Sequence, residues 1–566
     1  MNLIDRRLGL LFACFVLLLC AALGRAAWLQ AVQGSGYRAD ARSQQTEAVV
    51  VPGVRGAILD RNGQELAVSE DAASVFATPY QVEDPPAAAA QLAKVLHADE
   101  RKLLKQLADP DSGFTYLARK VDLPTAEKVS DLELAGVGML PDSRRIYPEG
   151  ELASQVIGTV GIDNQGLTGL EASEDEALHG TDGEREITRD ALGAELERDT
   201  IDASAAGTDL RLAIDASIQA TTERVIREIG ETYEPEGATA IVMDPQTSQV
   251  LGMANWPSVD PYALDEAKTE DLQNMATSFT FEPGSTFKAF TVAGALEEGL
   301  VKPSTPFNLA PTITVADRTI EEAHARGPVT LTVADILAQS SNVGAVTIGL
   351  ELNSERGDDA FDRWIRAFGF GEPTGIDFPG EEQGIVLPPD QYSGSSMGNL
   401  PIGQGLAVTP IQMASAYSAI ANGGILREPQ LVLEENGAPV PADPGERVIS
   451  ERNAERLREM LEGVLEAGGT ASAVQVPGYV LAGKTGTAQK VVDGTYSDTE
   501  YVGSFIGFAP AEDPRLLVSV VVDSPPYGVH YGGTVAAPAF GEIAKFALPH
   551  LGVAPDGSPA ESPLVP

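Results

Sequence analysis

The pattern of apolar and polar residues predicts a membrane segment followed by two regions of mixed helix and strand. Residues 8–29 are almost entirely apolar, with Arg25 as the only charged side chain. Between residues 30 and 205, short strand-like stretches alternate with helical ones. Residues 206–551 carry longer strand and helix patterns, and residues 552–566 are rich in Pro, Ser, Gly and Ala. We therefore expect an α+β chain with an N-terminal anchor, two domains with these boundaries and a disordered tail.

The apolar run is long enough to cross a membrane as one helix. Arg6 and Arg7 precede it and favour a cytoplasmic N-terminus, while Trp28 suits the opposite interface. Residues 1–7 would then be a cytoplasmic stub, and the rest of this single-pass chain would lie outside the cell membrane. A cleaved signal peptide is the alternative interpretation, but the length of the run favours an uncleaved anchor.

A candidate nucleophile, Ser285, follows a Pro-Gly pair at the start of a helical pattern that runs toward Glu298. Lys288 lies three residues later, one turn on and on the same face. A neutral lysine amine can take the proton of a serine hydroxyl if burial or nearby positive charge lowers its pKa. The helix N-terminus would favour negative charge that develops near Ser285. Alone, this motif is weak, because a serine at the start of a helix is usually only a cap.

Two further motifs strengthen the hypothesis of nucleophilic catalysis. The triplet Ser340–Asn342 offers a hydroxyl for proton relay and an amide that can hydrogen-bond a peptide substrate. The triplet Lys484–Gly486 lies in a strand-like stretch whose glycines would let another backbone approach closely. Taken singly, the first triplet is typical of a polar helix junction and the second of an edge strand with a surface lysine. Their order along the chain, after Ser285, is what predicts an enzyme.

The composition narrows the chemistry. Acidic residues number 82 and basic residues 39, and the formal net charge of −43 argues against a nucleic-acid partner. The two cysteines, Cys14 and Cys20, both lie in the apolar run, so no disulfide framework is expected outside it. No His/Cys cluster or His-Glu-x-x-His motif is present, and we expect neither a metal nor a cofactor. Catalysis would then depend on Ser, Lys, Asn and backbone groups.

With its three motifs in order, the chain resembles the class B penicillin-binding proteins, which are peptidoglycan D,D-transpeptidases. The resemblance covers nearly the whole chain. It implies a transpeptidase domain at 206–551, with a five-stranded antiparallel sheet between helices and the active site between the sheet edge and an all-helical subdomain. It also implies an elongated α+β pedestal of the dimerisation type at 30–205. The other stretches that carry the resemblance are 55–63, 145–148, 166–171, 403–409 and 532–538.

The resemblance implies a role for each candidate residue. Ser285 would attack the D-Ala-D-Ala carbonyl of a stem peptide, and Lys288 would take its proton. Ser340 and Lys484 would relay the proton to the leaving D-Ala; which lysine is neutral at rest stays open. The remaining predicted contacts are Asn342 with a peptide amide, Thr485 and Thr487 with the terminal carboxylate, the edge around Gly486 with the substrate backbone, and the N–H groups of Ser285 and Thr487 with the oxyanion.

The resemblance also implies partners. The ligands would be peptidoglycan stem peptides and β-lactam antibiotics, which mimic the D-Ala-D-Ala end. The protein partners would be a polytopic glycan polymerase and other membrane proteins of the division complex. The Trp28–Gln30 junction and the absence of a long insertion favour a division-type enzyme over the elongation-type sister.

Three other functions remain as alternatives. A D,D-carboxypeptidase or β-lactamase on the same fold needs an activated water to clear the acyl-enzyme, and the sequence shows no clear loop glutamate for that. A penicillin sensor or a non-catalytic scaffold of the division complex is the non-enzymatic alternative, against which the intact motifs argue. A bifunctional enzyme with a glycosyltransferase would need a different N-terminal domain.

Overall fold

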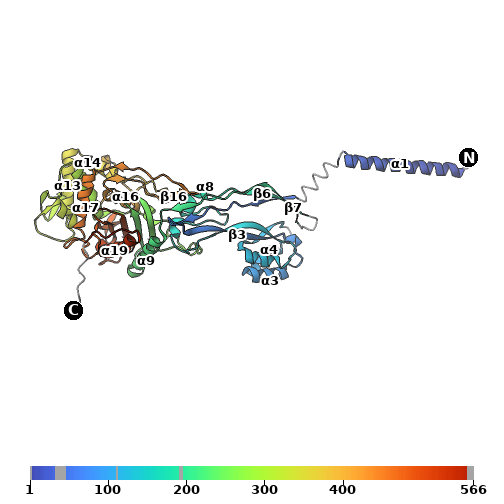
Figure 1. Cartoon of the computed structure of the whole chain (residues 1–566), viewed down its shortest axis with the longest axis horizontal. Helices are drawn as coiled ribbons and strands as arrows, with labels where there is room; N and C mark the ends of the chain where they lie inside the picture. The colour runs from blue at the N-terminus through green and yellow to red at the C-terminus, as the bar shows by residue number, and fades with distance from the viewer. Residues whose placement is uncertain (1–2, 32, 34–45, 110–111, 190–194, 558–566) are drawn as a thin grey trace. The chain divides into compact units, whose positions relative to one another are not determined.

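The computed structural model describes residues 3–31, 33, 46–109, 112–189 and 195–557 (Figure 1). The chain forms two compact units, and each is built from several segments. The smaller unit comprises Met1–Val54, Glu70–Arg144 and Gly180–Gly207, and the larger comprises Arg55–Ser69, Arg145–His179 and Thr208–Pro566. The domain boundaries expected from the sequence stay a prediction.

Helix α1 (Leu3–Ala31) contains the predicted membrane segment. Its span Arg6–Gln30 has a mean hydropathy of 2.3, and none of its most apolar stretch is buried against the protein. Among the described residues it is the one helix that is long and apolar enough to cross a membrane.

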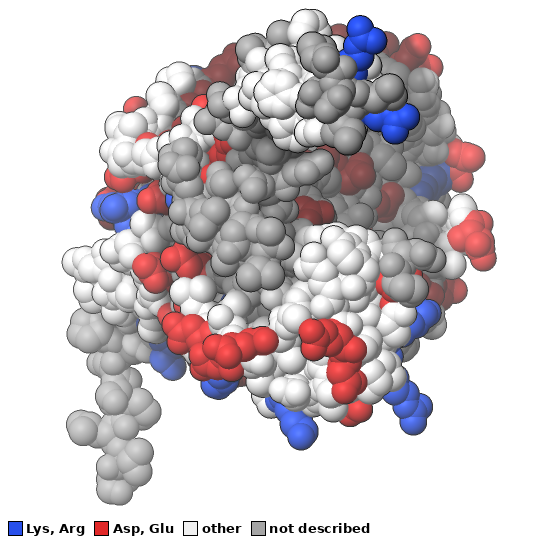
Figure 2. Space-filling view, turned by 90° about the vertical axis from the view of Figure 1, so that its right-hand side faces the viewer, with Lys and Arg blue, Asp and Glu red and all other residues white. Residues whose placement is uncertain are grey.

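The acidic character of the chain is visible on its surface. Figure 2 shows acidic side chains gathered in several groups on the face it presents.

The smaller unit contains a three-stranded antiparallel sheet in the order β1-β6-β7 and a separate layer of helices packed on β3 and β4. Three aspartates start the helices, since Asp84, Asp99 and Asp122 each accept backbone N–H groups of the first turn. The elements that lie wholly in this unit are β1 (Thr46–Val51), η1 (Pro79–Gln81), α3 (Pro85–Leu96), α4 (Glu100–Leu107), β4 (Thr115–Asp122), α5 (Leu123–Ser130), β6 (Gly183–Arg189) and β7 (Glu195–Asp202), whereas β3 (Glu65–Ala77) and β5 (Val137–Ile146) lie only partly in it.

The larger unit is built on a five-stranded antiparallel sheet in the order β10-β9-β21-β20-β19. Alternate side chains of β21 enter two different cores: Val518, Val520 and Val522 face one, and Leu517 and Val521 face the other. Both sides of the sheet are therefore covered, and the predicted α+β fold with its central sheet is confirmed. The strands are β9 (Gly237–Asp244), β10 (Gln249–Trp256), β19 (Ala482–Val492), β20 (Thr495–Ala509) and β21 (Leu516–Asp523).

Two groups of helices cover this sheet. Helices α9 (Ala216–Tyr233) and α19 (Ala537–His550) pack together on one face. Helix α16 (Pro410–Ala421) packs on the other face, with α17 (Glu451–Glu462) against β19. Thr409 and Gln412 form a capping box at the start of α16, with Pro410 in the first turn.

The remaining elements of the larger unit either form the helical region or lie outside it. Elements outside the helical region are β2 (Ile58–Leu59), α6 (Ser154–Ile157), α7 (Gly169–Ser173), α8 (Asp175–Leu178), β8 (Leu210–Leu212), α10 (Met275–Ser278), β15 (Ile425–Leu426), β16 (Val432–Glu435), β17 (Ala438–Pro439), β18 (Glu446–Arg447) and α18 (Gly532–Val535). The helical region contains η2 (Gly284–Phe287), α11 (Lys288–Glu297), β11 (Pro306–Leu309), β12 (Thr312–Val315), β13 (Arg318–Glu321), β14 (Val329–Thr332), α12 (Val333–Ala338), α13 (Asn342–Arg356), α14 (Ala360–Ala367), η3 (Pro389–Gln391), α15 (Ser396–Asn399) and η4 (Leu400–Ile402).

The predicted tail is only partly described. Tyr479 Oη donates a hydrogen bond to the Val553 carbonyl at 2.6 Å, and the Val480 N–H donates to Asp556 Oδ1 at 3.0 Å. Residues 553–556 therefore pack on the segment before β19. Residues 558–566, for which disorder is expected from composition, lie outside the described residues.

Candidate active site

Ser285 lies in a short 3₁₀ turn, η2, and not in the α-helix that the sequence predicted; α11 begins three residues later, at Lys288. Such turns are frequent at the start of an α-helix, and this one follows Gly284, which has a positive φ of 55° and donates its N–H to the Gly403 carbonyl at 3.0 Å. Tyr417 Oη donates to the carbonyl of Thr286 at 2.6 Å from the buried helix α16. The chain on both sides of Ser285 is thus held in place, while the serine itself is half-buried.

Lys288 is buried and hydrogen-bonded to the second motif. Its Nζ donates to the Ser340 carbonyl at 2.7 Å, to Ser340 Oγ at 3.2 Å and to Asn342 Oδ1 at 2.6 Å. Three acceptors match the three donors of an ammonium group, whereas a neutral amine has two N–H groups and a lone pair. To accept a proton from Ser285, Lys288 must therefore release one of these contacts.

The turn Ser340–Asn342 joins α12 to α13. Ser340 has a positive φ of 58°, which is uncommon for a residue with a side chain. Ser341 is the N-cap of α13, because its Oγ accepts the Gly344 N–H at 3.0 Å. The sharp turn separates the roles of the two hydroxyls: Ser340 faces Lys288, and Ser341 holds the helix.

The third motif lies on β19, at the edge of the sheet. Lys484 is fully buried, and its register partner on β20 is Ile506, which belongs to the core shared with the helical region. Cross-strand partners share a face of the sheet, so Lys484 faces the same side as Lys288. Gly486 lies close to the Ser285 turn: a Cβ atom there would lie 2.9 Å from the Pro283 carbonyl and would overlap Ser504 Oγ. The missing side chain lets β19 approach the Ser285 turn.

Burial lowers the pKa of both lysines. Burial brings the pKa of Lys288 down to about 7, with a smaller opposite effect from the carboxylate of Glu322. Burial also lowers the pKa of Lys484, well below its usual value, and the positive charge of Lys288 lowers that pKa further. The two amines therefore act on each other electrostatically, and at neutral pH a neutral lysine is available as a base.

Thr485 and Thr487 alternate with Lys484 along β19 and already have hydrogen-bond partners. The hydroxyls of Thr470 and Thr485 are 2.7 Å apart, and Thr487 Oγ1 accepts the Gly532 N–H at 3.1 Å. Thr487 thus contacts the start of α18, and Thr485 contacts the segment between α17 and β19. Their contact with a substrate carboxylate and the oxyanion contacts of the Ser285 and Thr487 N–H groups stay predictions.

Two glutamates near the motifs were not found from the sequence. Glu282 accepts the Gly405 N–H at 2.9 Å and Tyr496 Oη at 3.1 Å, and burial raises its pKa. Glu322 binds the turn of the second motif. Glu282 stands three residues before Ser285 and could have been suspected from its position, whereas nothing in the sequence around Glu322 marks it.

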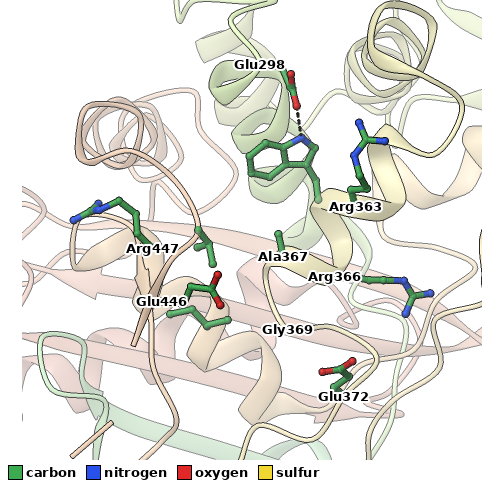
Figure 3. Close-up of a pocket in the computed structure, with 11 residues that line it drawn as sticks. Glu298, Arg363, Arg366, Ala367, Gly369, Glu372, Glu446 and Arg447 are labelled. Carbon is green, nitrogen blue, oxygen red and sulfur yellow. Dashed lines mark hydrogen bonds between the residues drawn. The ribbon is translucent and has the colours of Figure 1, made fainter. Parts of the chain in front are cut away.

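A separate hollow lies between the helical region and the strands β15 and β18 (Figure 3). Its lining carries charges of both signs, and the indole N–H of Trp364 donates to Glu298 Oε1 at 3.3 Å. No motif residue contributes to it. The charged residues that line it are Glu298, Arg363, Arg366, Glu372, Glu446 and Arg447. Among the described residues, no group of three or more His, Cys, Asp or Glu is arranged to hold a metal ion.

Comparison with known proteins identifies the family. Residues 50–212 match the penicillin-binding protein dimerisation domain, and residues 238–545 match the penicillin binding protein transpeptidase domain. The chain is 37% identical to stage V sporulation protein D of Bacillus subtilis, over 96% of this chain and 85% of that protein. It is 35% identical to peptidoglycan D,D-transpeptidase FtsI of Escherichia coli, over 98% and 93% of the two chains.

Solved structures agree with this match. A peptidoglycan synthetase from Bifidobacterium adolescentis has a TM-score of 0.72 at 28% identity, covering 91% of this chain and 99% of that one. Penicillin binding protein 3 from Mycobacterium tuberculosis, complexed with ampicillin, has a TM-score of 0.70 at 29% identity, covering 91% and 98%. The fold and the three converging motifs thus define a transpeptidase of the penicillin-binding type. Within that type, the chain belongs to the class B penicillin-binding proteins.

Proposed function

We propose that this D,D-transpeptidase cross-links peptidoglycan stem peptides through an acyl-enzyme on Ser285. The observation that carries the proposal is the position of Lys288, three residues after Ser285. Its side chain is buried and hydrogen-bonded to Ser340 and Asn342, and burial lowers its pKa to about 7. A serine needs such a base to become a nucleophile.

The reaction begins when Ser285 Oγ attacks the carbonyl carbon between the two D-Ala residues and Lys288 takes its proton. The oxyanion is bound by the N–H groups of Ser285 and Thr487, where one lost donor typically costs about 2.7–4 kcal/mol. Collapse breaks the peptide C–N bond, and the proton passes through Ser340 and Lys484 to the leaving D-Ala. The amine of a second stem peptide then attacks the ester, restores Ser285 and forms the cross-link.

The substrate is expected to bind as an additional strand beside β19. Residues 484–489 form the edge, where backbone hydrogen bonds supply affinity. Asn342 holds a peptide amide, and Thr485 and Thr487 hold the terminal carboxylate. Because β-lactams resemble the D-Ala-D-Ala end, they would acylate Ser285 and remain bound. The ampicillin complex of the Mycobacterium tuberculosis relative supports β-lactam binding at this fold.

We further propose that the chain is anchored by α1 with its N-terminus in the cytoplasm and works in septal wall synthesis. It would be partnered there with a polytopic glycan polymerase and division-complex membrane proteins. An elongation-type role is the alternative, and the two are separated by cell shape. Cells whose only copy carries Ser285→Ala should form filaments if the role is septal, and should become round if it lies in elongation.

The experiment that tests the acyl-enzyme is covalent labelling of the full-length protein with a fluorescent penicillin. Ser285→Ala should abolish labelling, because no other hydroxyl replaces the nucleophile. Ser341→Ala is the matched control and should keep most of the labelling, since it removes one contact of Glu322 but leaves the Ser340 and Asn342 side chains that contact Lys288 in place. Labelling that survives Ser285→Ala would exclude Ser285 as the nucleophile.

The hydrolase alternative is tested with nitrocefin. A carboxypeptidase or β-lactamase would release the acyl group and turn over repeatedly, whereas a transpeptidase would keep a persistent adduct whose mass maps to the tryptic peptide with Ser285. If the protein were a scaffold without catalytic activity, the Ser285→Ala variant would still support division.

A further inference from the structure

Glu322 is a buried carboxylate within an otherwise exposed segment beside the candidate active site. The residues between β13 and β14 are mostly exposed, including Ala323, His324 and Ala325. Glu322, in the same segment, has only 7% of its side chain exposed. A charged side chain is rarely buried without a specific set of partners, so its contacts are informative.

Both oxygens of Glu322 are used. Oε1 accepts the hydroxyl of Ser341 at 2.6 Å and the guanidinium of Arg326 at 2.5 Å. Oε2 accepts the backbone N–H of Asn342 at 2.7 Å. The carboxylate therefore binds the first turn of α13, where unpaired backbone N–H groups and the helix dipole favour a negative charge.

The contact continues to the catalytic lysine through Asn342. The side-chain Nδ2 of Asn342 donates to the carbonyl of Glu321 at 2.8 Å, which leaves its Oδ1 to accept Lys288 Nζ at 2.6 Å. An amide has one acceptor end and one donor end, so a partner on the donor end decides which end meets the lysine. The segment 321–322 thus sets both the backbone and the side chain of Asn342.

We propose that Glu322 is a positioning residue for acylation: it holds the Ser341–Asn342 turn against Lys288 and places a negative charge beside that amine. The inference rests on the proposed function, in which Lys288 is the base. Glu322 touches neither the nucleophile nor the substrate in this account, and it acts through Asn342 and through its charge.

The charged groups around Lys288 decide in which direction each substitution should shift the pKa of its amine. Lys484 approaches from β19, and Glu322 with its partner Arg326 approaches from the segment after β13. The negative charge of Glu322 favours the protonated form of Lys288 and raises its pKa, against the larger effect of burial. Removal of that charge should make Lys288 easier to deprotonate, whereas removal of Arg326 should make deprotonation harder.

The test is the pH dependence of acylation by a fluorescent penicillin, measured from pH 5 to 9 on the full-length protein in detergent. Glu322→Gln keeps the size of the side chain and removes its charge. The acid limb of the rate profile should then move to lower pH by about one unit, the size of shift typical of losing one nearby opposite charge. Arg326→Gln should move the limb to higher pH, and Glu322→Asp should return it toward the wild-type position.

Asp317→Asn is the control, since it removes a carboxylate from the exposed hairpin that precedes the same segment and should leave the profile unchanged. A limb that stays at the wild-type pH in Glu322→Gln overturns the proposal, even if the plateau rate falls, because that pattern belongs to a residue that only supports the fold. Failure of the proposed function is distinguishable, since the wild type would then show no labelling at Ser285.

Discussion

At the scale of single residues, the surroundings of Lys288 bring the pKa of its amine close to neutrality. Lys288 is enclosed, its three hydrogen bonds suit the ammonium form, and burial favours the neutral form. Burial, opposed by the smaller effect of the Glu322 carboxylate, lowers its pKa to about 7. A side chain in that condition can take up and release a proton at physiological pH, which is what acyl transfer requires of it.

The first prediction at this scale concerns pH. Acylation of the wild type requires neutral Lys288, so the rate should rise tenfold per pH unit below about 7 and level off above that pH. The measurement is the second-order rate of penicillin labelling at constant ionic strength. An acid limb above pH 9 would show that Lys288 titrates as an ordinary lysine and would contradict the assignment.

At the scale of elements, the Ser285 turn η2 packs closely against the edge strand β19. Three glycines allow this contact. Gly284 supplies the positive φ of the turn, Gly403 lies where a Cβ would overlap the Gly284 carbonyl, and Gly486 lies against Pro283 and Ser504. The third motif therefore contains a glycine for a steric reason that is independent of substrate.

The prediction for this contact is that Gly486→Ala separates β19 from the Ser285 turn. Its Cβ would overlap Ser504 Oγ and press on the Pro283 carbonyl at 2.9 Å. Overpacking of this kind typically costs about 1–3 kcal/mol of stability. We expect a lower melting temperature and at least a tenfold slower acylation, measured by thermal denaturation and penicillin labelling.

Gly327→Ala is the matched control for that substitution. A Cβ at Gly327 would meet no atom within 4 Å, and its φ lies outside the left-handed region. The control should match the wild type in both measurements. Normal acylation by Gly486→Ala would mean that β19 can retreat without disturbing the serine.

At the scale of the whole molecule, the two compact units are interleaved along the chain. Arg55 and Arg145, which are far apart in sequence and nearly fully buried, both bind Glu171, at 2.5 and 2.7 Å. These three residues come from the region expected to be the pedestal, yet they belong to the larger unit with the transpeptidase sheet. Such a buried cluster is costly to break, because a lost partner leaves an uncompensated charge.

The prediction at this scale concerns α1. If α1 is an uncleaved anchor, the intact mass of the mature protein should include residues 1–31, and the protein should stay with membranes after an alkaline wash. A variant that lacks residues 1–31 should be released and should still be acylated by penicillin, because the three motifs lie in the larger unit. A mature chain that begins after residue 25 would instead identify the segment as a signal peptide.

Much of the fold and the candidate site could be predicted from local pattern. The apolar run predicted the apolar helix α1, and the resemblance carried by the three motifs predicted the five-stranded antiparallel sheet. The α-helix expected from Ser285 begins at Lys288, after a 3₁₀ turn whose first residue, Gly284, bonds the distant Gly403, and a local pattern does not reveal such a contact. Glu322 was missed because an isolated glutamate in a polar segment has no sequence signal; only its burial against Asn342 sets it apart.

The sequence by itself determined the identity and order of the reactive groups. It also determined the apolar segment and the strand and helix patterns, since these depend on residues that are neighbours in the chain. The tertiary structure alone decided the protonation chemistry, because the pKa of a lysine depends on how much water and which charges surround it. In the amino-acid sequence, Lys288 and Lys484 are ordinary basic residues. They become coupled groups of lowered pKa only when a sheet edge, a 3₁₀ turn and a helix start enclose them together.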